Sequence, residues 1–72
     1  MQQPTIIRQN VHTGTRIFTP GQDGWEVDRG EIREDRRQPG LWLLLDRNGR
    51  RLGTVTGTEA AAEARLIAAT NT

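Results

Sequence analysis

The chain has 72 residues, no cysteine and one histidine, and its ten arginines and nine acidic residues give a formal net charge of +1. This composition excludes disulfides and cysteine metal sites, and a lone histidine cannot form a zinc site unaided. A chain of this length is predicted to form one domain, residues 1–72, with little surface to bury.

The hydrophobic core is predicted to be small. Leucine, isoleucine, valine and phenylalanine together make up 15 of the 72 residues, which is just above the range of chains that stay disordered. We therefore expect Trp25 and Trp42 to contribute a large share of the core, because each indole buries a large area.

The N-terminal half is predicted to be β-rich after a loose end at residues 1–4. Apolar and β-branched residues favour strands at residues 5–11 and 15–19. His12 to Thr15 is typical of a tight hairpin turn between them, and Pro20 to Gly24 is typical of a loop.

A second strand pair is predicted around Arg29-Gly30 as a two-residue turn. That register places Val27 opposite Ile32 and Glu26 opposite Arg33, an apolar pair and a pair of opposite charges. The following segment, residues 33–38, has no apolar residue and is predicted to be a solvated edge or a mobile loop.

Residues 41–56 contain five of the six leucines, one of the two tryptophans and the clearest turn motif. Asp46-Arg47-Asn48-Gly49 predicts a type I turn in a three-residue hairpin loop. Leu41 to Leu45 are apolar without alternation, which indicates a central strand covered on both faces. The C-terminal helix can cover one face, and either the N-terminal strands or a second copy of the chain can cover the other.

The C-terminal segment, residues 57–70, is predicted to be an α-helix of strong helix formers. Thr56-Gly57-Thr58-Glu59 matches a capping box, in which the Thr56 hydroxyl and the Glu59 carboxylate satisfy backbone donors. Ala60, Ala64 and Ile67 share one face of this helix, and small residues there allow close approach to a sheet. The predicted fold is α+β: a small antiparallel meander of five to six strands, in residues 5–56, with the helix packed on it and closure toward a barrel as an open alternative.

Catalysis is not expected, because the sequence lacks serine, cysteine, lysine and tyrosine. His12, in a predicted turn, is expected to be a solvated residue, and the acidic residues match no calcium loop. We expect no cofactor, no metal, no small-molecule substrate and no membrane segment, and we expect a cytoplasmic protein. The absence of lysine and serine beside many arginines and alanines indicates a high-GC genome, as in some bacteria and phages.

The arginines suggest one binding surface. Residues 29–51 contain seven arginines against four acids, a net charge of +3, and arginine binds phosphates through paired hydrogen bonds. We expect six of these arginines to form one basic edge that could bind DNA or RNA: Arg33, Arg36, Arg37, Arg47, Arg50 and Arg51.

The segment LWLLLDRNGRRLGTVTGTEA, within residues 40–70, resembles the end of the three-stranded-sheet-plus-helix domains with which some phage tyrosine integrases bind arm-type DNA sites. The resemblance implies a DNA-binding sheet face. Those domains present polar and basic strand residues, whereas this strand presents Trp42 and four leucines, so the family is not assigned.

The other interpretation is a protein-interaction module, either a homodimer or an adaptor for a larger partner. A thin core and a strand that is apolar on both faces favour an interface through Trp42, Leu43, Leu45 and Val55. The sequence favours this non-catalytic protein-binding function slightly, because the charge is so balanced, and it keeps a nucleic-acid-binding accessory domain as the alternative.

Overall fold

The structure of the chain is a computed structural model that describes residues 6–71. Its five strands form one antiparallel sheet in the order β1-β2-β3-β4-β5, so each strand pairs with its neighbours in sequence. The sheet is not closed into a barrel, and the predicted α+β class is confirmed. The expected loose end at residues 1–4 lies outside the described residues. The elements are β1 (Ile7–Val11), β2 (Gly14–Pro20), β3 (Glu26–Glu34), β4 (Leu41–Leu45), β5 (Arg51–Thr56) and α1 (Glu59–Thr70).

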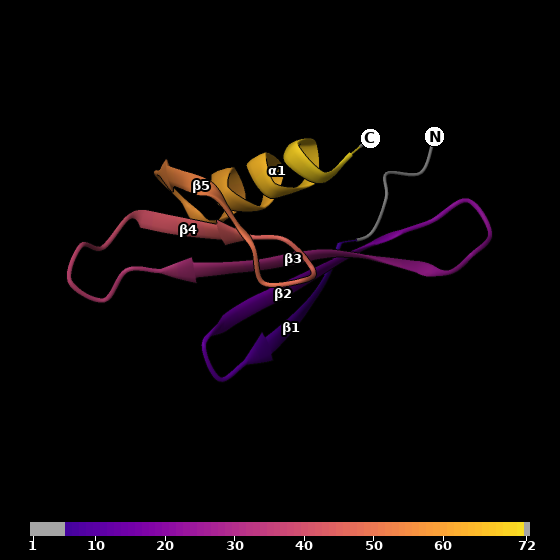
Figure 1. Ribbon diagram of the computed structural model, residues 1–72, viewed down its shortest axis with the longest axis horizontal. Helices are drawn as coiled ribbons and strands as arrows, with labels where there is room; N and C mark the ends of the chain where they lie inside the picture. The colour runs from indigo at the N-terminus through magenta and orange to yellow at the C-terminus, as the bar shows by residue number, and fades with distance from the viewer. Residues whose placement is uncertain (1–5, 72) are drawn as a thin grey trace.

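The helix α1 lies against one face of the sheet, where it contacts β3, β4 and β5 (Figure 1). The β1–β2 hairpin extends the sheet beyond β3 and twists away from the helix (Figure 1). The N-terminal strands therefore do not curl over the opposite face, which was one of the two coverings expected for it. We call that opposite face the open face.

The core lies between α1 and the sheet. Ile17, Ile32, Leu44, Ala62 and Leu66 are buried there, one from each of β2, β3 and β4 and two from the helix. Their burial removes apolar surface from water, which is the main favourable contribution to folding.

The two tryptophans have different environments, contrary to the prediction that both contribute to the core. Trp42 packs against the core from β4. Trp25 is 79% exposed and lies in the connection between β2 and β3. The prediction for Trp25 was wrong because the hairpin tip that carries it extends past the helix, so that α1 does not cover the indole as it covers the core (Figure 1).

The predicted turn at Arg29-Gly30 is also wrong, because β3 runs unbroken from Glu26 to Glu34. The register shifts where Ile17 pairs with Gly30 and Phe18 with Asp28, so Arg29 is an extra residue in β3, as in a β-bulge. Gly30 has a φ of +111°, and its α-carbon faces the carbonyl oxygen of Leu45. Glycine is needed here for a bulge and a close approach rather than for a turn.

The extra residue of the bulge binds the helix. Arg29 donates from Nε to the Thr19 hydroxyl at 2.8 Å and from Nη1 to the Thr70 carbonyl oxygen at 3.1 Å. The last turn of α1 contains no basic residue of its own. Arg29 thus supplies a cation at the negative end of the helix dipole.

The β4–β5 hairpin forms as predicted. Asp46 accepts hydrogen bonds at its carboxylate from the backbone N–H groups of Asn48 and Arg50, at 2.9 and 2.8 Å. Its carbonyl oxygen accepts from Gly49 at 3.0 Å, and Gly49 has a φ of +83°. An aspartate at the first position and a left-handed glycine at the fourth explain why the motif was recognisable.

The strand β4 is interior but not central, since β3 occupies the middle of the sheet. Its helix side carries Trp42 and Leu44, which contact the core. On the open face Leu41 and Leu43 are only half-buried. Within residues 6–71, the expectation that both faces of this strand are covered therefore holds on the open face only at Leu45, which is buried.

The helix begins two residues later than the capping box predicts. Thr58 is the N-cap, and its hydroxyl accepts a hydrogen bond from the Ala61 N–H at 3.2 Å. The buried residues of α1 are Ala62, Glu63 and Leu66. Of the face predicted to meet the sheet, Ile67 packs against the core, whereas Ala60 and Ala64 are exposed. The larger apolar side chains Leu66 and Ile67, rather than the alanines Ala60 and Ala64, therefore determine which side of the helix meets the sheet. Within the described chain, α1 is too short to span a bilayer.

Candidate binding surface on the open face

Leucines of β4 form the apolar centre of the open face. Leu43 lies opposite Arg33 on β3 and opposite Thr54 on β5, so these three side chains form one row across the sheet. Leu41 and Leu45 lie on the same side, two residues away in each direction. A shallow groove runs over this region and is lined by Arg33, Glu34, Asp35, Leu41, Leu43, Arg51 and Thr54.

The four residues predicted as a protein interface do not form one surface. Trp42 and Val55 pack against the core on the helix side, and the Trp42 Nε1–H donates to the Gly57 carbonyl oxygen at 2.9 Å. Leu45 faces the other way and is buried. Only Leu43 of this set contributes a partly exposed side chain to the open face.

Beside the leucines, the open face carries paired charges on β2 and β3. Arg33 bonds Glu31 at 2.7 Å, and Arg16 forms an ion pair with Asp28 at 2.9 Å. Arg16 also donates to the carbonyl oxygen of Arg47 at 2.9 Å, which connects β2 to the β4–β5 turn. These contacts neutralise much of the charge on this half of the face.

Glu31 is the most buried member of this charged row, at 6% exposure. Burial opposes its ionisation, but hydrogen bonds from Arg33 and Thr13 and the charges of Arg33 and Arg16 outweigh it and lower the pKa of its carboxyl below the ordinary value. Thr13 donates to Glu31 at 2.7 Å. Glu31 is therefore an ionised, structural carboxylate that holds Arg33 and Thr13 in place on the open face.

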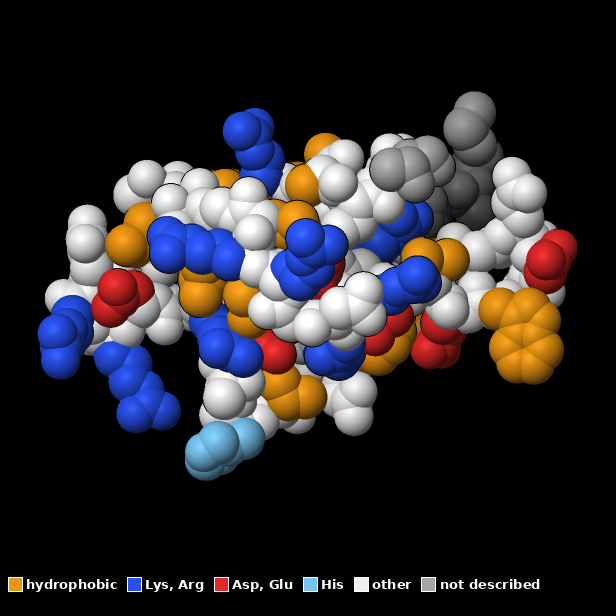
Figure 2. All heavy atoms as spheres, in the orientation of Figure 1, with side chains coloured by type: hydrophobic (Ala, Val, Ile, Leu, Met, Phe, Trp, Pro, Cys, Tyr) orange, Lys and Arg blue, Asp and Glu red, His pale blue; other side chains and the backbone are white. Residues whose placement is uncertain are grey.

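The six candidate arginines do not form a single edge. Arg33 lies on β3 and is paired with Glu31, whereas Arg51 begins β5 and lines the groove. The other four lie in turns at opposite ends of β4, because β3–β4 and β4–β5 are consecutive antiparallel connections. Figure 2 accordingly shows basic side chains spread over the molecule with acidic side chains between them. The turn at residues 35–40 carries Arg36 and Arg37, and the turn at residues 46–50 carries Arg47 and Arg50.

Five of these arginines form no ion pair with any residue in the described range. The acidic residues near these arginines form hydrogen bonds to the backbone of the turns. Asp35 accepts from the Arg37 backbone N–H at 2.8 Å, and Glu34 accepts from the Gly40 N–H at 3.1 Å. Asp46 is used in the same way in the other turn. Residues 46–51 therefore combine three free guanidinium groups with one carboxylate, the strongest local excess of positive charge on the hairpin.

Sequence reasoning missed several residues of this surface. Leu41, Thr54 and Arg16 belong to it, and the signal for the first two was the period of two along β4 and β5. Arg16 could be placed only once the pairing of β2 with β3 was known. Across residues 6–71, no three histidine, aspartate or glutamate side chains converge as a metal site.

In comparisons with protein-family models, with curated protein sequences and with solved structures, no match to the chain was found.

Proposed function

We propose that this chain is a non-catalytic nucleic-acid-binding module that places the open face of β3, β4 and β5 against duplex DNA. The observation that carries the proposal is the placement of free arginines in the turns at both ends of β4, in the part of the sheet whose other face is covered by α1. Three antiparallel strands followed by a helix on one face is also the arrangement that the resemblance to arm-binding integrase domains implies.

The dimensions suit a major groove. The five residues of β4 span about 14 Å at about 3.4 Å per residue, close to the roughly 12 Å width of the groove. Arginines in the two turns are then spaced to reach phosphates on either side, while the strand lies between them. Phosphate contacts of this kind fix the position of a protein on DNA.

Between the arginines, the row of Arg33, Leu43 and Thr54 faces outward. A threonine hydroxyl can bond base edges, and apolar side chains contact the thymine methyl group in the major groove. The net charge of only +1 predicts modest affinity, dominated by a few phosphate contacts and lost at moderate salt.

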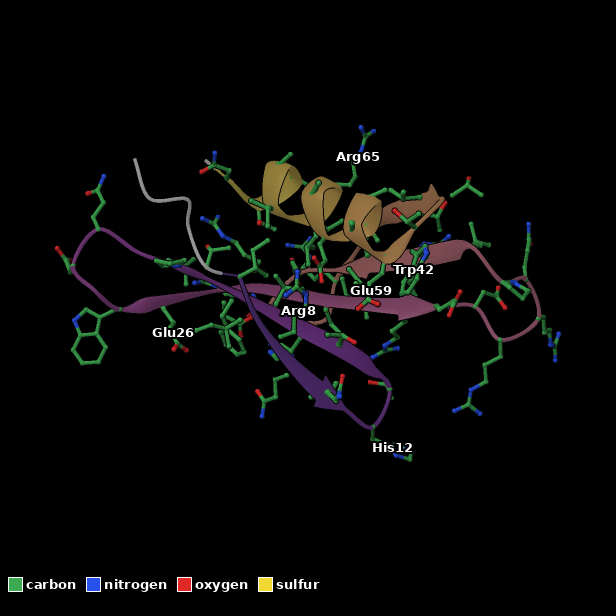
Figure 3. The ribbon with its side chains drawn as sticks, turned by 180° about the vertical axis from the view of Figure 1, so that it is seen from behind. Arg8, His12, Glu26, Trp42, Glu59 and Arg65 are labelled. Atoms are coloured by element: carbon green, nitrogen blue, oxygen red, sulfur yellow. The ribbon has the colours of Figure 1, made fainter. Side chains whose placement is uncertain are left out.

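The test is a salt titration of duplex DNA binding by the full chain and by Arg47→Ala/Arg51→Ala. We expect the double variant to bind more weakly and to show a smaller salt slope, by about one unit per lost phosphate contact. Arg65→Ala is the matched control, because Arg65 points away from the sheet on the outer side of α1 (Figure 3). Equal loss in both variants, or no binding at low salt, would refute the proposal.

A second candidate function is protein binding through the groove over Leu41 and Leu43. The observation that favours it is the half-exposure of Leu41 and Leu43 beside Arg33 and Arg51, since protein interfaces combine an apolar centre with a polar rim and are enriched in arginine. Sedimentation of the same samples tests its homodimer form. A dimer that dissociates in Leu43→Asp, together with absence of DNA binding, would favour this second function.

A further inference from the structure

Trp25 is the most exposed large apolar residue of the described chain. It lies in the connection between β2 and β3 with 79% of its surface accessible to water. Tryptophan is usually well buried in monomers and is strongly enriched among the residues that dominate binding energies. Its exposure at a hairpin tip therefore needs an explanation other than folding.

The turn that carries Trp25 has a defined backbone. The Gly21 N–H donates to the Trp25 carbonyl oxygen at 2.6 Å, and the Gly24 N–H donates to the Gly21 carbonyl oxygen at 3.3 Å. Gly24 adopts a φ of +80°, which favours glycine. The indole is consequently presented from an ordered turn, which lowers the entropy that a partner must overcome on binding.

The surroundings of the indole are acidic. Residues 20–27 contain Asp23 and Glu26 and no basic residue, and both carboxylates are exposed. Neither forms an ion pair within the structure as described. A hollow beside Trp25 is lined by Phe18, Gly24, Trp25 and Glu26, so it combines two aromatic side chains with a carboxylate.

These groups match the chemistry of a side-chain cation. An indole attracts a guanidinium or ammonium group through its ring electrons, and a nearby carboxylate adds a charge-assisted hydrogen bond. Phosphate is disfavoured by the two carboxylates. The tip is also at one end of the long axis of the molecule, and the turn with Arg36 and Arg37 is at the other (Figure 1).

We propose that the β2–β3 tip docks an arginine- or lysine-bearing segment of a partner protein, with Trp25 stacked on the cation, Glu26 of the same hollow bonded to it, and Asp23 adding negative charge to the tip. This surface is separate from the open face of β3, β4 and β5. The inference therefore does not depend on the nucleic-acid proposal, and either one can fail without the other.

The test uses the full chain carrying Trp42→Phe, so that the emission comes from Trp25 alone. A short arginine–glycine peptide is the probe, and the corresponding glutamate–glycine peptide is its control. We expect the arginine peptide to quench the emission and the glutamate peptide to leave it unchanged. The double variant Asp23→Asn/Glu26→Gln is expected to weaken binding roughly tenfold. Trp25→Ala is expected to abolish binding, which is measured by calorimetry because this variant lacks the fluorescent indole.

Two control variants test whether binding depends on the β2–β3 tip itself or only on exposed negative charge and exposed apolar surface in general. Glu59→Gln removes an exposed acid from the helix, and Leu52→Ala removes another exposed apolar side chain; both should bind the peptide as the parent does. If the Trp42→Phe variant does not fold, the NMR signal of the Trp25 indole N–H in the isotope-labelled, otherwise unmodified chain reports peptide binding instead. Equal response to both peptides, or unchanged binding in the tip variants, would overturn the proposal. Self-association that Trp25→Ala abolishes would overturn it too, because the occupant would then be a second copy.

Discussion

Arg8 of β1 bonds both carboxylate oxygens of Glu63 in α1, with Nη2 donating to Oε1 at 2.8 Å and Nε donating to Oε2. Glu63 is 3% exposed, whereas about half of the Arg8 side chain is accessible. The hydrogen bond and the charge of Glu63 raise the pKa of Arg8. This pair joins the first strand of the sheet to the last element of the chain, 55 residues later.

Breaking this pair from the arginine side is expected to destabilise the fold, because the buried Glu63 carboxylate loses its bidentate partner. Arg8→Ala should lower the urea midpoint clearly, and Arg65→Ala, which removes an exposed arginine of α1, should leave it nearly unchanged. In a double-mutant cycle, Arg8→Ala and Glu63→Ala should cost less together than the sum of the two single variants. Strict additivity would show that the pair contributes no coupling.

Glu31 makes stability depend on pH. Its pKa is lower in the folded chain than the ordinary value of 4.5, so the unfolded chain binds the proton more tightly. Glu31 therefore contributes stability above pH 4.5, and this contribution is lost as the pH falls through the lower pKa of the folded state. Urea unfolding of Glu31→Gln should show a smaller decline below pH 4.5 than the parent. An identical decline in both would contradict the assignment.

Gly30→Ala should destabilise the sheet by about 3 kcal/mol or more. An added methyl group would collide with the Leu45 carbonyl oxygen and lie 2.9 Å from the Asp46 α-carbon. Gly49→Ala is the control, because Gly49 has a positive φ of +83° but no atom within 4 Å of the added carbon. It should cost only about 1 kcal/mol, measured by chemical denaturation, and similar costs at the two positions would contradict the close approach.

Two threonines can be compared as the N-cap of α1: Thr56, which the capping box predicted, and Thr58, which is the N-cap in the structure. Thr58→Ala is expected to cost about 1 kcal/mol, because the Ala61 N–H then loses its acceptor. Thr56→Ala, in the last residue of β5, should have a much smaller effect on thermal unfolding. A larger loss of stability in Thr56→Ala than in Thr58→Ala would instead support Thr56 as the N-cap, as the capping box predicted.

The two tryptophans should differ sharply in their effect on stability. Trp42→Ala is expected to cost about 2–3 kcal/mol, since Trp42 packs on the core and bonds Gly57. Trp25→Ala should change the free energy of unfolding by less than about 0.5 kcal/mol. Calorimetric scans of both variants measure this difference, and a large loss for Trp25→Ala would place its side chain in the folded core.

Features set by neighbouring residues could be predicted from the sequence. The Asp46–Gly49 turn, the turn after Val11 and the existence of the helix all depend on side chains within a few positions of one another. The antiparallel meander, predicted with five to six strands, followed from these because consecutive antiparallel strands were the simplest way to join the turns, and the structure has five.

Features set by distant partners could not be predicted. Glycine with a positive φ suits a two-residue turn and a bulge equally, and the choice at Gly30 depends on β2 and on the end of β4. The burial of Glu63 likewise depends on Arg8, far away along the chain. Apolarity alone placed Trp25 in the core, although no helix or strand between residues 6 and 71 covers the tip on which it lies.

The candidate surface was predicted in part. The arginine-rich character of residues 33–51 was evident, but a count of charges does not show that one strand separates the two turns. The four apolar residues predicted as one interface lie on two faces of the sheet. This division follows from the alternation of side chains along β4, which places Trp42 and Leu43 on opposite faces. Period-two alternation is hidden when every residue of a strand is apolar.

The extra residue in β3 restricts how the length of this chain can change. Insertions in the turns at residues 21–25 or 35–40 would lengthen exposed connections at small entropic cost. Deleting Arg29 would instead restore regular pairing with β2, remove the donor that reaches the Thr70 carbonyl, and bring Asp28 into the place of Arg29. The sheet and the last turn of the helix are thus coupled through the number of residues in one strand, and a single-codon deletion there would act on both.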